Sequence, residues 1–252
     1  MNINAMHVTF RGFGQQMGMQ TVRAILSEDI DICLNAAIND IVRMSLIQST
    51  QQQNYVDKVI RQNTVIVPVN ALRTLYKSQK IDYPEVKGTT KPNEDGTSKK
   101  PFTFSIDTEN IMLLTGIKIE YGDTGGYVAN SIQDCRIIEA EDLGQTIRDF
   151  CNRPAPDAPI CTVFNGNDIN DLDVKVYNGV EKGYNGKLTS VIPIGFQYVY
   201  IKNPAIVSYN DNIDCDLPIY MHNEVVERAV QKYLASIGAT SGNNRQQQQN
   251  NQ

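Results

Sequence analysis

Hydrophobic residues near both ends of the chain recur every three or four positions, which is the spacing of one helix face. Towards the C-terminus, between Leu217 and Gly238, they are Met221, Val225, Val226, Ala229, Val230, Tyr233, Leu234 and Ile237. Between Ser27 and Thr50 they are Ile30, Leu34, Ala37, Ile38, Ile41 and Met44. Pro218 and Gly238 are typical of a first helical turn and of a helix end, respectively. We therefore predict two long helices that pack against each other, with the rest of the chain inserted between them.

The central part of the chain has the apolar and polar alternation of short β-strands, for example around residues 102–106, 172–176 and 196–201. Asn178-Gly179 and Asn185-Gly186 are dipeptides that favour tight hairpin turns. A short helix near residues 142–151 is expected, with Asp142 as its cap. The predicted fold class is α+β, in which the terminal helices form a small bundle with an inserted antiparallel β-rich domain.

Three polar stretches complete the predicted domain organisation. Residues 1–18 are rich in Gly, Met and Gln and are interpreted as a short strand or an ordered arm, within an N-terminal arm and helical part spanning 1–62. The β-rich domain spans 63–216 and contains a long polar loop at 85–101. The C-terminal helix covers 217–238, and the Gln/Asn-rich residues 239–252 are expected to form a disordered tail.

Charge is distributed unevenly along the chain. Residues 61–104 hold eight Lys or Arg and four Asp or Glu, whereas residues 105–176 hold five and thirteen, respectively. This asymmetry fits either solvated loops or a subunit with oppositely charged flanks that suit head-to-tail contacts between identical copies. We expect the 85–101 loop to contact a neighbouring subunit or ring through Lys91, Lys99 and Lys100.

Composition narrows the range of functions. The net charge of −5 argues against tight nucleic-acid binding, which needs clustered Lys and Arg. No apolar run is long enough to span a membrane, and the N-terminus lacks the pattern of a secretory signal. The five cysteines are scattered, so we expect reduced thiols in a protein made in a cytoplasm.

The sequence contains no recognisable catalytic, cofactor or metal motif, and a non-enzymatic protein is expected. The two histidines, His7 and His222, have no partner at metal-ligand spacing, and His222 is expected at the helix surface or in a capping role. A hydrolase using Cys151 or Cys161 remains an alternative without a supporting motif. The run 165–173 is rich in oxygen ligands but lacks the Gly and Glu positions of a calcium-binding loop. The aromatic stripe Phe196, Tyr198 and Tyr200 is interpreted as core packing, with a sugar-binding platform as the alternative.

Three segments, taken in their order along the chain, resemble structural proteins of podovirus-like tails, particularly those of crAss-like bacteriophages. They are SEDIDICLNAAINDIV at 27–42, RPAPDAPI at 153–160, and YVYIKNPAIVSYNDNIDCDLPIYMHNEVVERAVQKYLASIG at 198–238. The last of these combines a strand, a Lys-x-Pro break, a Leu-Pro cap and a His-x-Glu-Val-Val helix. The family that they suggest is the head-to-tail connector ring, or tail hub, below the portal.

This resemblance implies a virion protein made in the bacterial host cytoplasm, without catalytic residues or cofactors. It implies a homo-oligomeric ring of about twelve copies, matched to the portal. Its partners would be the portal and other connector or tail proteins, and genomic DNA would pass through the lumen without specific binding. The 85–101 loop and the C-terminal tail have no counterpart in the resemblance. A tail-tube component, a fibre adaptor and, more remotely, a carbohydrate-binding module remain alternatives.

Overall fold

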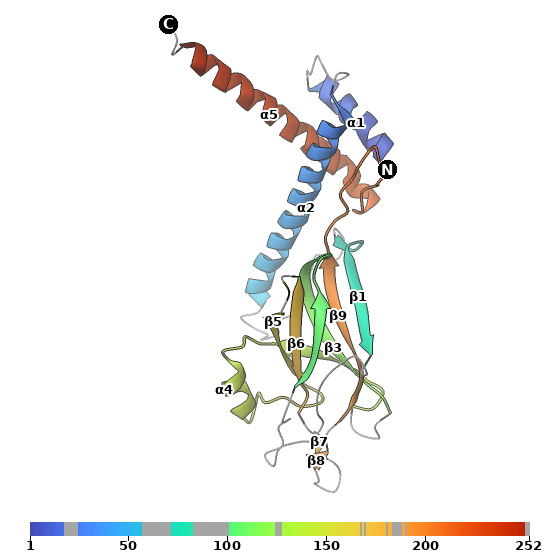
Figure 1. The fold of residues 1–252 in the computed structure, drawn as a ribbon, viewed down its shortest axis with the longest axis vertical. Coiled ribbons are helices and arrows are strands. Elements are labelled where there is room, and N and C mark those ends of the chain that lie inside the picture. Colours follow the sequence, from blue (N-terminus) through green and yellow to red (C-terminus); the bar gives the residue numbers. More distant parts are fainter. Residues whose placement is uncertain are drawn as a thin grey trace. The chain divides into compact units, whose positions relative to one another are not determined.

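The computed structural model of the chain describes residues 1–17, 25–56, 72–82, 101–123, 128–166, 168, 170–179, 181–182, 188–189 and 191–249. They form two compact units (Figure 1). The helical unit comprises the described parts of Met1–Gln52, Ile66–Leu75 and Pro204–Gln252, and the sheet unit those of Gln53–Val65 and Tyr76–Asn203. The predicted α+β fold class, with terminal helices and a β-rich insertion, is confirmed.

The two long helices of the helical unit are α2 (Ser27–Val56) and α5 (His222–Gln249), and a short 3-10 turn, η3 (Ile219–Met221), precedes α5. The predicted apolar faces are buried in both, except that Met44 on α2 and Ile237 on α5 are exposed and Tyr233 and Leu234 are half-buried. Lys232 on α5 pairs with Asp40 on α2 at 2.6 Å, so the two helices contact each other as predicted.

The N-terminal residues form a helix, α1 (Ile3–Gln16), so the prediction of a strand or arm was wrong. The side chain of Asn2 caps this helix by accepting a hydrogen bond from the backbone nitrogen of Ala5 at 2.9 Å. Its buried positions have helical spacing: Ile3, Met6, His7, Phe10 and Gly14. Phe10 packs edge-on against Tyr233 of α5, with ring centroids 6.0 Å apart. Helix α1 accordingly lies beside α5 in the fold (Figure 1).

The sheet unit is built on one seven-stranded sheet. In chain order its strands are β1 (Tyr76–Asp82), β2 (Phe102–Asp107), β3 (Ile111–Tyr121), β4 (Ile132–Ile137), β5 (Ile160–Asn165), β6 (Asp171–Tyr177) and β9 (Pro193–Lys202), and their spatial order is β1-β9-β3-β4-β5-β6-β2. Every neighbouring pair is antiparallel except β4 and β5, which are parallel and are connected through the short helix α4 (Leu143–Arg148). A small separate hairpin is formed by β7 (Glu181–Lys182) and β8 (Leu188–Thr189).

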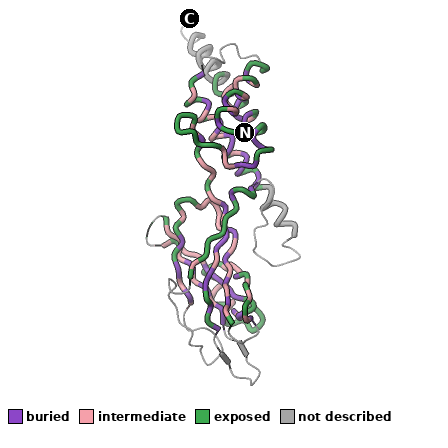
Figure 2. Tube along the Cα trace, turned by 90° about the vertical axis from the view of Figure 1, so that its right-hand side faces the viewer, coloured by how far each residue is buried: buried purple, intermediate pink, exposed green. Residues whose placement is uncertain are grey.

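The sheet curls around an aromatic core. Phe196 of β9 lies 5.2 Å from Phe104 and 5.8 Å from Phe102 between ring centroids, although β2 and β9 are not neighbours in the sheet. Buried positions alternate with more exposed ones along several strands (Figure 2). Phe196 and Tyr198 are buried and Tyr200 packs against this core, which agrees with the interpretation of the aromatic stripe as core.

The structure differs from the predicted domain boundaries, and residues 72–75 belong to the helical unit instead of the β-rich domain. Residues 204–216 belong to the helical unit instead of the β-rich domain. Helix α5 continues past Gly238 to Gln249, where a disordered tail was expected. The Ala and Gln residues in this extension have high helix propensity. The helix therefore continues across the glycines, although each glycine costs about 1 kcal/mol of helix stability relative to Ala. Residues 250–252 and most of the 85–101 loop lie outside the described residues.

Candidate functional site

The residues singled out from the sequence do not form a common site. Lys91, Lys99 and Lys100 lie outside the described residues. His222 is buried instead of lying at the surface, and its Nε2 donates to the carbonyl oxygen of Leu217 at 2.8 Å. Cys151 is exposed and Cys161 is buried. Within the described ranges, no three His, Cys, Asp or Glu side chains are placed to hold a metal ion, and no helix is suited to crossing a bilayer.

The structure instead draws attention to residues 204–220, which connect β9 to helix α5 and which we call the anchored segment. It has no regular helix or strand before η3, apart from an isolated bridge between Ser208 and Ile213. A tight turn from Tyr209 to Asn212 places Asn212 at a φ of 54°, in the left-handed region that Asn tolerates better than most residues. Despite this irregular backbone, side chains from α1 and α2 fix the segment at several points.

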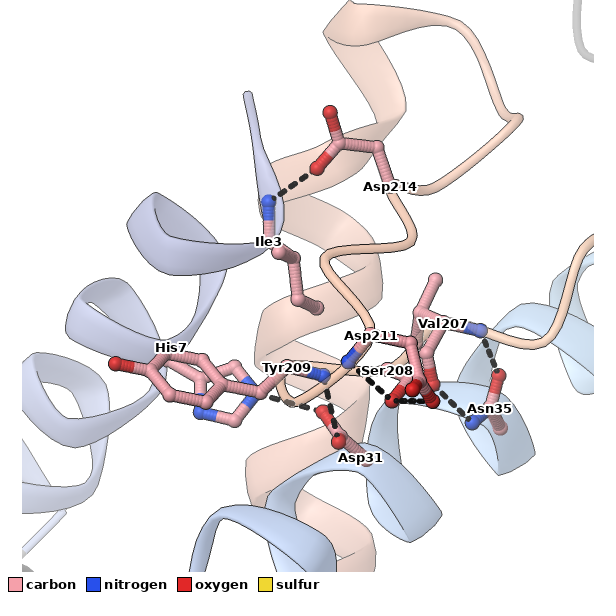
Figure 3. A network of polar contacts seen from close by, with 9 residues as sticks. All are labelled: Ile3, His7, Asp31, Asn35, Val207, Ser208, Tyr209, Asp211 and Asp214. Atoms are coloured by element: carbon pink, nitrogen blue, oxygen red, sulfur yellow. Dashed lines mark hydrogen bonds and ion pairs between the residues drawn. The ribbon is translucent and has the colours of Figure 1, made fainter.

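The first anchor is Asp31 of α2, which joins α1 to the segment. One carboxylate oxygen of Asp31 accepts a hydrogen bond from Nε2 of His7 at 2.7 Å, and the other accepts one from the backbone nitrogen of Tyr209 at 2.9 Å. The Tyr209 ring packs against the imidazole of His7 at a tilt of 34°, with centroids 4.7 Å apart. Figure 3 shows Asp31 between the two residues that it connects.

The second anchor is Asn35, one helical turn after Asp31. Its side-chain amide donates to the carbonyl oxygen of Val207 at 3.0 Å, and its side-chain oxygen accepts from the nitrogen of Val207 at 2.8 Å (Figure 3). The Asn35 side chain thus satisfies both the N–H and the C=O of buried Val207, as the backbone of a neighbouring strand would. Both anchors lie on the same side of α2, because side chains four residues apart are neighbours on a helix.

Further contacts hold the segment to α1 and to itself. Asp214 accepts a hydrogen bond from the backbone nitrogen of Ile3 at 2.7 Å, which satisfies one of the free donors in the first turn of α1. The Ser208 hydroxyl donates to Asp211 at 2.8 Å, and Asp216 accepts from the nitrogen of Ala205 at 3.3 Å. The backbone of the segment is therefore pre-organised by polar contacts that do not use its apolar side chains.

Several of those apolar side chains are exposed, whereas Val207 and Leu217 are buried. The large ones with high exposure are Ile206 at 75%, Tyr209 at 41%, Ile213 at 40%, Ile219 at 77% and Tyr220 at 62%. Single exposed hydrophobic residues are ordinary, but five of them within one fixed segment are characteristic of an interaction surface. The anchored segment is therefore the candidate functional site.

The His7–Asp31 pair resembles a catalytic base with its orienting carboxylate, but its surroundings indicate an architectural role. His7 is 1% exposed and lies beneath Tyr209, so a substrate has no access to its ring. The cysteine of the segment, Cys215, is a poor nucleophile because burial raises its pKa and favours the protonated thiol. Among the described residues, no hydroxyl or thiol group is hydrogen-bonded to His7.

Comparison with known proteins does not assign a family. No protein-family model matches the chain, and no curated protein sequence matches it significantly.

Proposed function

We propose that this protein is a virion structural subunit that forms an oligomeric ring in the head-to-tail connector of a bacteriophage. In this role the ring lies between portal and tail and surrounds a central channel for the genome. The proposal is supported by the ordered resemblance of residues 27–42, 153–160 and 198–238 to connector proteins of crAss-like phages. The last of these segments contains the anchored segment, so the resemblance and the candidate site coincide in the chain.

The structural observation that carries the proposal is the outward display of five large apolar side chains by a fixed backbone. Complete burial of one such side chain is worth about 1.5–3 kcal/mol, and a backbone that is already ordered loses little further entropy on binding. A segment of this kind suits a permanent protein–protein contact better than a reaction, because both carboxylate oxygens of Asp31 are already hydrogen-bonded and the His7 ring is buried beneath Tyr209. The net charge of −5 also suits a lumen through which DNA slides without sticking.

Other tail components, such as a tube protein or a fibre adaptor, would use a similar surface in an assembly of different symmetry. The carbohydrate-binding alternative gains no support, since Phe196 and Tyr198 are buried in the sheet core.

The proposal is tested by locating the protein in particles. A polyclonal antibody against the purified chain, used for immunogold labelling of phage particles from the host, should label one discrete position at the junction of head and tail. Image reconstruction of that junction should then show a ring with the density of this fold. Labelling at the tail tip or along a tube would favour the alternatives, and purified particles that lack the chain by mass spectrometry would refute a structural role.

A further inference from the structure

The anchored segment has a distinct charge as well as exposed apolar side chains. Residues 204–220 contain Asp211, Asp214 and Asp216 and not a single Lys, Arg or His. Asp211 and Asp214 are exposed. A surface that binds this segment should therefore combine apolar side chains with positive charge, because complementary potentials favour the correct partner and an unpaired buried carboxylate is costly.

The helical unit carries a surface with these properties on α2. Arg43, Met44 and Ile47 are exposed and lie within about one turn of the helix, and we call them the α2 patch. Arg228 of α5 adds a second guanidinium, with Nη1 3.0 Å from the sulfur of Met44. The positive charge of Arg228 is neutralised by Glu224, whose carboxylate accepts a hydrogen bond from Nη2 at 2.7 Å. Arg43, in contrast, forms an ion pair with no acidic side chain among the described residues. The α2 patch is therefore apolar with a net positive charge.

The two surfaces are separated along the same helix. The anchored segment is fixed to α2 at Asp31 and Asn35. Met44 follows Asn35 by nine residues (44 − 35), which corresponds to about 13 Å along the helix axis. Two complementary patches at different places on one subunit are the requirement for a head-to-tail contact, which closes into a ring when the rotation between subunits allows it.

We infer that the anchored segment of one copy docks on the α2 patch of the next copy, and that this contact repeats around the assembly. The inference rests on the proposed ring function, for which it names the subunit interface. Ile206 and Ile219 supply the apolar contacts, and Asp211 and Asp214 face Arg43 of the neighbouring copy.

The test compares single substitutions in the full chain. Ile219→Asp disrupts the anchored segment, and Met44→Asp disrupts the α2 patch. Ile132→Asp is the matched control, because Ile132 is 57% exposed but lies on β4 in the sheet unit. Size is measured by mass photometry and sedimentation velocity over a range of concentrations. Circular dichroism and amide exchange of Val207 and Tyr209 show whether each variant retains its fold.

The wild-type chain and the control should form species larger than dimers, and each interface variant should weaken association at least tenfold. The decisive sample is an equimolar mixture of Ile219→Asp and Met44→Asp chains. In this mixture one intact anchored segment can meet one intact α2 patch, so dimers should appear and larger species should not. If either variant fails to fold, Ile206→Asp and Arg43→Glu take their places.

Several outcomes would overturn the inference. They are a wild-type chain that remains monomeric or stops at a dimer, interface variants that assemble as the wild type does, and a variant mixture that contains only monomers. These results are distinguishable from failure of the proposed function. Variants that still assemble leave a connector role intact if the particles contain the chain, whereas particles without the chain refute that role whatever the solution measurements show.

Discussion

The bidentate contact between Asn35 and Val207 allows a quantitative test of how the anchored segment is fixed. Asn35→Ala removes two hydrogen bonds, of 2.8 and 3.0 Å, and leaves both peptide groups of buried Val207 without their partner. Leaving one buried polar group without its partner costs about 1–3 kcal/mol, so two such groups give an expected loss of about 2–6 kcal/mol. Because 1.4 kcal/mol is a factor of ten, local opening should increase by about 30- to 20,000-fold.

Amide hydrogen exchange is the suitable assay, because it reports on the segment itself and does not assume that two units unfold in one step. Asn39→Ala is the control, since Asn39 is an exposed residue one turn further along α2. Both substitutions change the helix propensity of α2 equally, so the difference between them isolates the contact with Val207. The reasoning is refuted if the Val207 amide exchanges less than threefold faster in Asn35→Ala than in Asn39→Ala.

Three further predictions concern the sheet unit. Gly179→Ala should destabilise it by more than about 1–2 kcal/mol in denaturant titrations, because Gly179 has a φ of 63° and an added Cβ would lie 2.1 Å from the carbonyl oxygen of Pro154. Gly144→Ala is the control and should be neutral or stabilising, because a Cβ added there meets nothing within 4 Å. Phe196→Ala should lower the free energy of unfolding by about 3–5 kcal/mol through loss of its contacts with both β2 phenylalanines, and an unchanged melting temperature would contradict this. Iodoacetamide at pH 8 should label exposed Cys151 in the native protein and spare buried Cys135. The pKa of Cys135 is raised well above its usual value by burial and by a hydrogen bond with Cys161, which keeps the thiol protonated. Equal labelling of both cysteines in peptide mapping would disprove the buried Cys135–Cys161 pair.

The long helices and the fold class were predictable because their information is local. The α2 and α5 faces repeat every three or four residues, and that period alone fixes which side is buried. Helix α1 was missed because two of its buried positions are His7 and Gly14, which do not count as hydrophobic in a pattern search. Strand β1 was missed for the opposite reason. Almost all of its residues are exposed at the sheet edge, so no alternation marks it, and only its pairing with β9 defines it.

The anchored segment could not be identified from the sequence, where its latter part reads as a polar loop before the last helix. Its anchors, Asp31 and Asn35, are separated from Tyr209 and Val207 by 178 and 172 positions. No local pattern reports a hydrogen bond over that distance. Nor does a sequence distinguish a polar loop exposed to water from one whose carboxylates are occupied by the protein and whose isoleucines face outward.

The division of the helical unit between both ends of the chain has a consequence for biosynthesis. Helices α1 and α2 leave the ribosome first, but α5, which covers them, follows only after the whole sheet unit has been translated. At about 5–20 residues per second, this delay lasts about ten seconds or more. The sheet unit can fold during this interval, whereas the helical unit is completed only when the last helix emerges.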